Sequence, residues 1–478
     1  MPFQPFLALA AGAESHPADL FYADNSQTVT FSEARDVAVQ FAGQLRLSGV
    51  KAGDTVAIDL PKGMQVLFAF AVAHLGAVSA TVSVQTSPTG ITWDWWLTSQ
   101  NGQSRAAHNS VIIDNEFLIR AAGLTTALKA TPYTADDAVC RIALTSGTTG
   151  RSKGIALSVA MVEHRASEAA RLFTAGKPFL CTLGLGTTSG FHTLIAGVRA
   201  GLPYLSPSNG PGNRDAIRRH GVAAIKASPQ QISDIVTAST GEYLDSLRTA
   251  YSAGGKVSQS LADGLRSVSG ATIVNLYGSS EAGRAAEHTL ESIVNPDHAG
   301  RVVAGTTLDV VDDRGNPIPR GTTGVIRYRT PLMAVAYLGD EVATVETFRD
   351  GWFYPGDIGR LDADGSLYLT GRVSDTLNAG GTKIDPTEFE AFATTLPGIT
   401  EALGFTHTND LGVPQFVLAI AGNSPDVAAV SVAIEGRFGR SRPSGIFSVP
   451  AIPRTETGKA SRHLTAELYA EALARANP

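Results

Sequence analysis

The chain has 478 residues, of which 43% are hydrophobic and 17% are charged, and its formal net charge is −6. This composition is typical of a globular protein with more than one core, and it excludes a disordered or fibrous chain. The acidic balance and the dispersed basic residues argue against nucleic acid or an anionic membrane as the main partner. The two cysteines, Cys140 and Cys181, cannot build a disulfide framework, so we expect a reducing, cytoplasmic location.

The first third of the chain predicts helices and strands in alternation. Residues 29–33 (Val-Thr-Phe-Ser-Glu) are typical of a capped helix start, and a short strand is expected at 56–60. The longest apolar stretch, 64–84, approaches the ~20 residues that cross a membrane. His74 and Gly76 interrupt it, and its second half is rich in Val, Ser and Thr. We therefore predict a buried helix followed by a strand, and no membrane span.

The middle of the chain predicts an α/β fold. Strands are expected at 179–183, 223–227 and 250–252, with helices at 160–173 and 257–268. Such alternation is typical of parallel sheets covered by helices. From residue 307 to 371 the pattern changes to alternating residues and Gly/Asp turns, which predicts an antiparallel, barrel-like subdomain.

One loop has the composition of a phosphate-binding site. The apolar strand 142–144 leads into Thr-Ser-Gly-Thr-Thr-Gly-Arg-Ser-Lys-Gly, residues 145–154. Glycines allow the backbone to approach phosphate oxygens, hydroxyls and N–H groups donate to them, and lysine adds a charge. A Walker A loop is excluded, because Ser152 stands where glycine must precede Lys153. The residues alone also allow a flexible surface turn.

Three further motifs follow along the chain. Residues 275–281 (Asn-Leu-Tyr-Gly-Ser-Ser-Glu) combine an aromatic ring that can stack on adenine, hydroxyls that can reach a phosphate, and a carboxylate that can hold Mg²⁺. Residues 354–359 (Tyr-Pro-Gly-Asp-Ile-Gly) lead to Gly371-Arg372. Residues 453–459 (Pro-Arg-Thr-Glu-Thr-Gly-Lys) lie near the C-terminus. Each motif alone is compatible with an ordinary turn.

The four motifs, in this order, resemble those of the adenylate-forming superfamily of AMP-binding enzymes, above all its acyl- and aryl-CoA synthetases. Ser152 replaces the usual proline of that family, and Ser280 replaces a threonine. The resemblance implies that the chain activates a carboxylic acid with ATP to acyl-AMP, releases pyrophosphate, and transfers the acyl group to CoA as a thioester. It implies ATP, Mg²⁺ and CoA as the small molecules used, and a monomer or homodimer.

The resemblance also implies the roles of individual residues. The catalytic residues would be Lys459, Glu281, Ser280 and Thr148, with Glu281 holding the metal. The nucleotide would be bound by Thr145, Ser146, Gly147, Thr149, Gly150, Lys153, Gly254, Gly255, Asn275, Tyr277, Gly278, Asp357 and Arg372.

A domain boundary is expected just after Arg372. Residues 1–373 would form a large N-terminal domain, and residues 374–478 a small, mobile α+β domain that carries Lys459. Ser374 occupies the hinge position, where the family commonly has Asp or Lys. The acceptor loop would contain Ala379, Gly380 and Gly381, with room for a pantetheine arm, although a plain connection between a strand and a helix fits these residues equally well.

The acid itself is less defined. The loop 185–191 contains no acidic residue, which disfavours a free α-amino acid, and Leu185-Gly186 replaces the aromatic–histidine pair of many relatives. Small residues would suit a bulky or aromatic acid, although turn glycines are an equally good interpretation, and His192 is more often a packing residue. The candidate pocket residues are Gly186, Thr187, Thr188, Phe191 and Gly283.

Two alternative functions stay open. The acyl group could pass to a carrier protein or to an amine. No carrier motif follows Lys459, so a carrier protein would act in trans. The chain could also bind a nucleotide or acyl-adenylate without turnover, although the complete set of charged motif residues argues against that.

Overall fold

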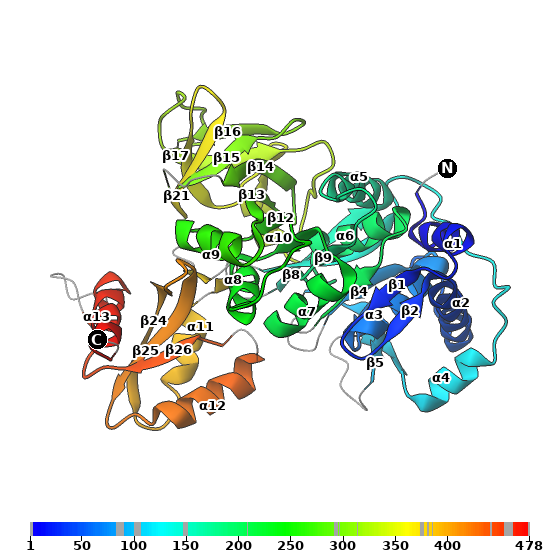
Figure 1. Ribbon diagram of the computed structural model, residues 1–478, viewed down its shortest axis with the longest axis horizontal. Coiled ribbons are helices and arrows are strands. Elements are labelled where there is room, and N and C mark those ends of the chain that lie inside the picture. Colours follow the sequence, from blue (N-terminus) through cyan, green and yellow to red (C-terminus); the bar gives the residue numbers. More distant parts are fainter. Residues whose placement is uncertain are drawn as a thin grey trace.

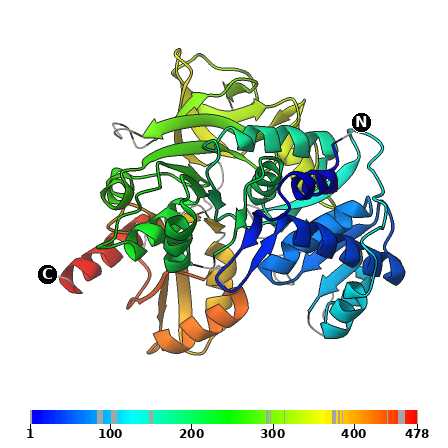
Figure 2. The same ribbon diagram turned by 45° about the vertical axis from the view of Figure 1, so that its right-hand side comes forward.

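The computed structural model describes residues 3–82, 90–99, 107–146, 152–207, 209–290, 295, 297–312, 314–372, 377–379, 382–384, 386–439, 442–453 and 462–476. Two large sheets with their helices make up the N-terminal part, and a smaller unit with its own sheet follows (Figure 1). Figure 2 shows the same separation from a second direction, with the C-terminal elements apart from the N-terminal helices.

The first sheet has six strands in the order β6-β5-β3-β4-β7-β8. All neighbours are parallel except β7 and β8, which pair antiparallel on either side of the predicted phosphate loop. The strands are β3 (Thr55–Asp59), β4 (Val78–Thr81), β5 (Trp93–Thr98), β6 (Ala107–Ile112), β7 (Val139–Ser146) and β8 (Ser152–Ser158). The core on this sheet includes fully buried aromatic side chains such as Trp93, Trp96 and Phe70.

Helices pack around this sheet: α1 (Pro5–Ser15), α2 (Phe31–Ser48), α3 (Lys62–His74), α4 (Asn115–Ala122), α5 (Val159–Ala170) and α6 (Thr188–Arg199). The predicted capped start of α2 is confirmed: the Thr30 side chain accepts from the Glu33 N–H, and Glu33 accepts from the Thr30 N–H. The predicted helix followed by a strand in the long apolar stretch is confirmed by α3 and β4. Of the described helices, none combines the length and apolar character that a membrane crossing needs.

The second sheet has twelve strands. Four are parallel neighbours, namely β9 (Phe179–Cys181), β11 (Ala224–Ala227), β12 (Thr249–Ala253) and β13 (Thr272–Ser279). Helices α7 (Gly210–His220), α8 (Pro229–Ala238) and α9 (Gln259–Ser269) lie between these strands in sequence, as the alternation predicted. A further small sheet joins β1 (Leu20–Ala23), β2 (Thr28–Thr30) and β10 (Tyr204–Leu205).

The predicted antiparallel region is confirmed, but it is continuous with the parallel strands. Strand β13 pairs antiparallel with β14 (Gly283–Leu290), and the sheet continues through β15 (His298–Val302), β21 (Ser366–Arg372), β20 (Asp357–Leu361), β17 (Gly324–Arg329), β19 (Trp352–Phe353) and β18 (Phe348–Arg349), with β16 (Thr307–Val311) beside β17. Helix α10 (Glu341–Thr347) precedes β18. Because β13 extends to Ser279, the second motif lies largely within a strand.

The C-terminal unit has a three-stranded sheet of β24 (Ile399–Thr408), β25 (Pro414–Gly422) and β26 (Gly445–Ser448). It also contains the hairpin β22 (Leu377–Ala379) and β23 (Thr382–Ile384), and helices α11 (Pro386–Ala393), α12 (Val427–Phe438) and α13 (Arg462–Ala476). Phe389, Phe416 and Ile434 belong to its own core. The loop between β24 and β25 contacts the N-terminal part. Val413 of this loop is buried in the core of the second large sheet, and Ser258 Oγ donates to the Leu411 carbonyl. The boundary at residue 373 lies outside the described residues and stays a prediction.

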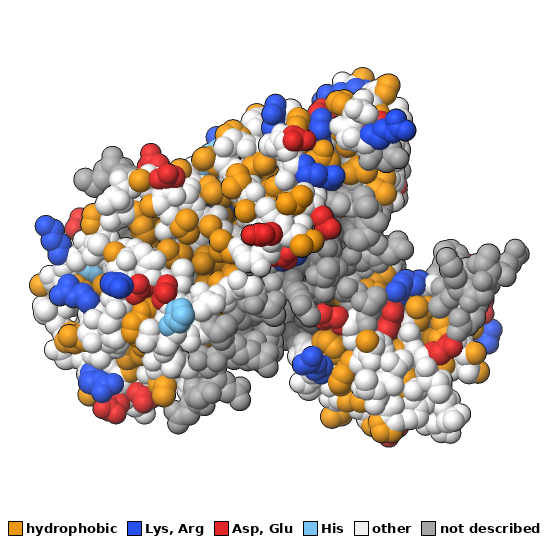
Figure 3. Space-filling view, turned by 180° about the vertical axis from the view of Figure 1, so that it is seen from behind, with side chains coloured by type: hydrophobic (Ala, Val, Ile, Leu, Met, Phe, Trp, Pro, Cys, Tyr) orange, Lys and Arg blue, Asp and Glu red, His pale blue; other side chains and the backbone are white. Residues whose placement is uncertain are grey.

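One face of the molecule is shown in Figure 3. Positive and negative side chains are interspersed there, without a large field of one sign, and hydrophobic side chains are scattered between them.

Candidate active site

The predicted nucleotide residues come from both large sheets. Thr145 and Lys153 lie on β7 and β8 of the first sheet, where they are directly opposite each other in the antiparallel pairing. Tyr277 lies near the end of β13, Glu281 follows that strand, and Asp357 begins β20. The candidate site is therefore assembled from strand ends that are more than 200 positions apart in sequence.

Tyr277 and Asp357 form one side of this site. The Tyr277 hydroxyl donates to Oδ2 of Asp357 at 2.7 Å, and only 6% of Asp357 is exposed. On the neighbouring strand, Arg372 is the Cα partner of Asp357. The contact shows that the second and third motifs meet, and it places an aromatic ring beside a carboxylate.

Glu281 is held by a residue that the sequence analysis did not identify. The Tyr337 hydroxyl donates to Oε1 of Glu281 at 2.7 Å, and the ammonium group of Lys153 lies 4.7 Å from the centre of the Tyr337 ring. Burial and the adjacent Glu281 carboxylate raise the pKa of Tyr337, so this hydroxyl stays a proton donor at any neutral or mildly alkaline pH. Tyr337 thus links the predicted metal-binding carboxylate to the predicted phosphate-binding lysine.

Arg165 of α5 fixes the backbone of the same segment. Its guanidinium donates to the carbonyl oxygens of Ser280 at 2.6 Å, Glu281 at 2.9 Å and Leu332 at 3.4 Å. Burial lowers the pKa of Arg165 to about 10, which still leaves it charged at neutral pH. Two of these charge-assisted hydrogen bonds hold the turn after β13, and the third ties it to the segment of Leu332.

The N-terminus of α6 contacts the same turn. Thr187 caps the helix by accepting from the Gly190 N–H, and Thr188 Oγ1 lies 3.2 Å from Ser280 Oγ. One predicted pocket residue, Thr188, is thereby brought to the predicted catalytic Ser280. Gly186 is close to the first sheet, because a Cβ there would lie 3.0 Å from the Thr81 carbonyl oxygen.

Phe191 has a packing role in this structure. It is only 4% exposed, and the guanidinium of Arg141 lies 4.5 Å from the centre of its ring. Arg141 is fully buried and donates to the Leu185 carbonyl at 2.6 Å and to Thr81 Oγ1 at 2.7 Å. This arginine ties the loop before α6 to the first sheet. That Phe191 contacts the substrate stays a prediction.

Two predicted nucleotide residues carry buried oxygens without a partner among the described residues. These atoms are Thr145 Oγ1 and Asn275 Oδ1. Buried polar atoms are usually hydrogen-bonded, and the exceptions call for an explanation. A phosphate oxygen would accept from the threonine hydroxyl, and an amino group such as that of adenine would donate to the asparagine oxygen. The residues present therefore fit a nucleotide.

Several predicted glycines lie at tight positions. Gly254 and Gly283 have positive φ angles of 94° and 79°, and a Cβ on Gly278 would lie 2.4 Å from the Gly283 carbonyl oxygen. Gly255 directly follows Gly254 after β12. These glycines permit the close approach of β13 and β14 and the turn after β12, so their structural role is clear and a ligand contact stays a prediction.

Some predicted residues lie in strands whose backbone alone is described, or outside the described residues. Ser146, Arg372 and Ala379 belong to β7, β21 and β22. Gly147, Thr148, Thr149, Gly150, Ser374, Gly380, Gly381 and Lys459 lie outside the described residues. Within the described part of the chain, no three His, Cys, Asp or Glu side chains gather into a metal site.

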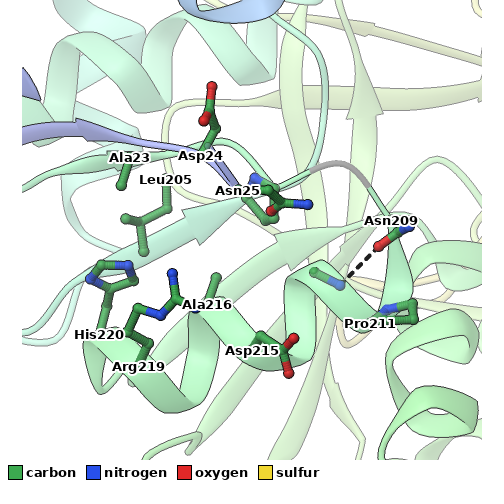
Figure 4. A pocket seen from close by; sticks show the side chains of 12 residues that line it. Ala23, Asp24, Asn25, Leu205, Asn209, Pro211, Asp215, Ala216, Arg219 and His220 are labelled. Carbon is green, nitrogen blue, oxygen red and sulfur yellow. Dashed lines mark hydrogen bonds between the residues drawn. The ribbon is translucent and has the colours of Figure 1, made fainter. Parts of the chain in front are cut away.

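A separate pocket lies between the β1–β2 hairpin and α7 (Figure 4). Asp24 and Asn25 line it on one side, and Arg219 and His220 on the other, while Asn209 caps α7 by accepting from the Gly212 N–H. None of the predicted site residues lines this pocket.

Tyr337 and Arg165 had no recognisable signal in the sequence. Both are single polar residues within ordinary segments, outside the motifs. A tyrosine between apolar residues, here Ala336 and Leu338, is usually a core residue, so only its contact with Glu281 reveals a role.

Comparison with known proteins identifies the family. A model of the family described as AMP-binding enzyme matches residues 9–93 and 96–338, which is most of the chain. The chain belongs to this family. The predicted resemblance is thereby confirmed, and the matched residues include the first two motifs.

Curated relatives cover nearly the whole chain. The 2-succinylbenzoate–CoA ligase of Geobacillus kaustophilus is 27% identical over 470 residues, which are 93% of this chain and 94% of that protein. The 3-hydroxybenzoate/4-hydroxybenzoate–CoA ligase of Thauera aromatica is 26% identical over 499 residues, 91% of each chain. Both are acid–thiol ligases, the class that the sequence predicted.

Solved structures confirm the fold. The o-succinylbenzoate CoA synthetase of Bacillus subtilis has a TM-score of 0.78 at 24% identity, over 96% of this chain and 98% of that one. An amide bond synthetase of Marinactinospora thermotolerans has a TM-score of 0.79 at 20% identity, over 98% and 100%. The predicted α/β architecture with a small C-terminal unit agrees with both.

Proposed function

We propose that this AMP-binding enzyme is an acid–thiol ligase that activates a carboxylic acid with ATP and transfers the acyl group to CoA. The observation that carries the proposal is the linked arrangement of Lys153, Tyr337 and Glu281 beside Tyr277 and Asp357. It joins a cation, a carboxylate for a metal and a site for an adenosine in one place. The relatives named above, which are CoA ligases, support the thiol as acceptor.

In the first half-reaction a carboxylate oxygen of the acid would attack the α-phosphorus of ATP. The bond from that phosphorus to the bridging oxygen of pyrophosphate breaks, and acyl-AMP forms. Reactions of this kind depend on positioning and on neutralising negative charge. Thr145 and Lys153 would bind the phosphates, and Asp357 would bind the ribose hydroxyls.

Mg²⁺ would neutralise phosphate charge at Glu281. Tyr337 orients that carboxylate by its hydrogen bond, and Arg165 fixes the backbone that carries it. Ser280, next to Thr188, would donate to the α-phosphate. Lys459 would supply a further positive charge from the C-terminal domain during adenylation.

In the second half-reaction the CoA sulfur would attack the carbonyl carbon of acyl-AMP. The bond to the phosphate oxygen breaks, AMP leaves, and the thiol proton is released. The loop of Ala379, Gly380 and Gly381 would face the acceptor after the C-terminal domain rotates about Ser374.

Acid-dependent exchange of labelled pyrophosphate into ATP tests the first half-reaction, with aryl, fatty and amino acids and no thiol present. Exchange with one class of acid is expected, and aryl acids are the first choice because the relatives act on them. Product formation from that acid with CoA, an amine or a carrier protein then identifies the acceptor. ATP binding without exchange for any acid would favour a non-catalytic binder and contradict the proposal.

A further inference from the structure

A lysine in the middle of the second sheet has no role in the mechanism above. Lys226 lies on β11, which pairs in parallel with β9 on one side and β12 on the other. Central parallel strands are usually apolar on both faces, and lysine is among the residues least often buried. Its presence there therefore calls for an explanation.

The strand register places Lys226 on the same face of the second sheet as Leu276, whereas Tyr277, one residue further along β13, faces the other side. Its Cα partners are Cys181 and Tyr251, and Ala224, two residues earlier, packs with Leu276 in one cluster. Alternate strand residues share a face, so Lys226 faces the same way as Ala224 and Leu276. This is the face toward α6, because the Lys226 charge acts on the buried imidazole of His192.

The distance from Lys226 to the nucleotide corner follows from the register. Lys226 is level with Tyr251, and Tyr251 is level with Val274. Tyr277, which contacts Asp357, lies three residues further along β13, which is about 10 Å along the strands at ~3.3 Å per residue, and two strand spacings of ~4.8 Å to the side. An acid whose reacting carboxylate lies near the strand ends would have to extend several atoms along the sheet to reach Lys226.

The charge of Lys226 is not balanced by the described residues. No carboxylate among them lies within ion-pair distance of its ammonium group, and its side chain is only partly buried. The nearby Cys181 thiol does not neutralise it, because burial raises the pKa of that thiol. A charge withdrawn from water without a partner is destabilising, so an anion supplied from outside would be stabilised there.

The neighbouring cations differ from Lys226 in this respect. Arg284 is paired with Glu168 and Glu287, each at 2.8 Å, and Arg165 donates to three backbone carbonyls. His192 is 4% exposed, its Nε2 has no described partner, and burial together with Arg165 and Lys226 lowers its pKa well below the ordinary value. The neutral imidazole can donate to a ligand or accept from one, while Lys226 supplies the available charge.

We propose that the ammonium group of Lys226 binds a second anionic group of the acid, so that the substrate is a dianion such as a dicarboxylate. The proposal rests on the proposed function, and it specifies the substrate class of the same site. The reacting carboxylate would lie near the strand ends, and the second anionic group would lie along the sheet at Lys226.

The test uses pairs of acids that differ by one carboxylate. Benzoate is compared with isophthalate and terephthalate, hexanoate with adipate, and 4-phenylbutyrate with 4-(4-carboxyphenyl)butyrate. Pyrophosphate exchange gives kcat/KM for each acid, and calorimetry with a non-hydrolysable ATP analogue gives binding without turnover. The full-length protein is compared with Lys226→Met, Lys226→Glu and Lys177→Met, in which an exposed lysine just before β9 is replaced.

In at least one pair, kcat/KM is expected to be about 10-fold or more higher for the dianion than for the monoanion, which is the size of effect that a charge-assisted hydrogen bond gives. Lys226→Met is expected to bring that ratio close to one by lowering kcat/KM for the dianion, and Lys177→Met to leave it intact. Lys226→Glu is expected to prefer 6-aminohexanoate over adipate.

The possible failures are distinguishable. Exchange with no preference for any dianion, or a preference that survives in Lys226→Met, would overturn the role of Lys226 and leave the proposed function in place. Binding of a dianion that depends on Lys226, without exchange, would overturn the proposed function and support the lysine site. Neither binding nor exchange for any pair would overturn both.

Discussion

The contact between Tyr337 and Glu281 gives the sharpest test of the active-site geometry. Tyr337→Phe removes only the hydroxyl that donates to Oε1 of Glu281 at 2.7 Å. The ring is kept, so the cation–π contact with Lys153 at 4.7 Å should persist. The variant therefore separates the orientation of the carboxylate from the position of the lysine.

The expected loss follows from the type of hydrogen bond. A hydrogen bond to a charged group contributes about 1.5–3 kcal/mol. If all of it serves to orient Glu281 for the metal, kcat/KM for adenylation should fall about 10- to 100-fold. The Mg²⁺ concentration for half-maximal rate should rise in parallel, because a freely rotating carboxylate must be ordered by the ion itself.

Pyrophosphate exchange at a series of Mg²⁺ concentrations measures both quantities. Tyr133→Phe is a matched control, since it removes another buried hydroxyl, one that donates to the Ala77 carbonyl at 2.6 Å in the first sheet. Tyr337→Leu removes the ring next to Lys153 as well as the hydroxyl, so its effect on exchange should include the loss of both contacts. An unchanged Mg²⁺ dependence in Tyr337→Phe, with the fold intact, would refute the orienting role of Tyr337.

Three further predictions concern adenylation and stability. Lys459→Ala should lower pyrophosphate exchange on the order of 10²-fold, as the removal of one preorganised charge does, and a normal rate would disprove its assignment. Arg141→Met should lower the free energy of unfolding by about 2 kcal/mol or more, because the Leu185 carbonyl and Thr81 lose their buried donor; denaturant titration checks this, and an unchanged midpoint would contradict it. Burial lowers the pKa of His192, so protonation favours the unfolded chain, and below about pH 6.5 this residue should cost up to ~1.4 kcal/mol per pH unit. Thermal unfolding from pH 7.5 to 5 should therefore show a smaller acid destabilisation in His192→Leu than in the wild-type protein, and parallel curves would argue against a buried neutral imidazole.

The sequence by itself determined the local structure and the family. The capped start of α2 depends on Thr30 and Glu33, which are three residues apart, so short-range hydrogen bonding was enough to predict it. The alternation of apolar runs predicted the parallel strands and their helices, because each side chain's face follows from the period of the element. The motifs pointed to Lys153, Glu281 and Asp357 since glycines, hydroxyls and charges gather there within a few residues.

The tertiary structure alone decided which distant residues meet. Nothing near Tyr337 in the sequence indicates that it would contact Glu281, 56 positions earlier, and Lys226 reads as an ordinary strand residue until the register places it between β9 and β12. The continuity of the twelve-stranded sheet likewise depends on β13 pairing with β14 along residues 273–279. Such contacts arise from packing between elements, whose geometry no local pattern of residues encodes. Here they include Tyr337, which contacts the predicted metal-binding carboxylate, and Lys226, which has no ion-pair partner among the described residues.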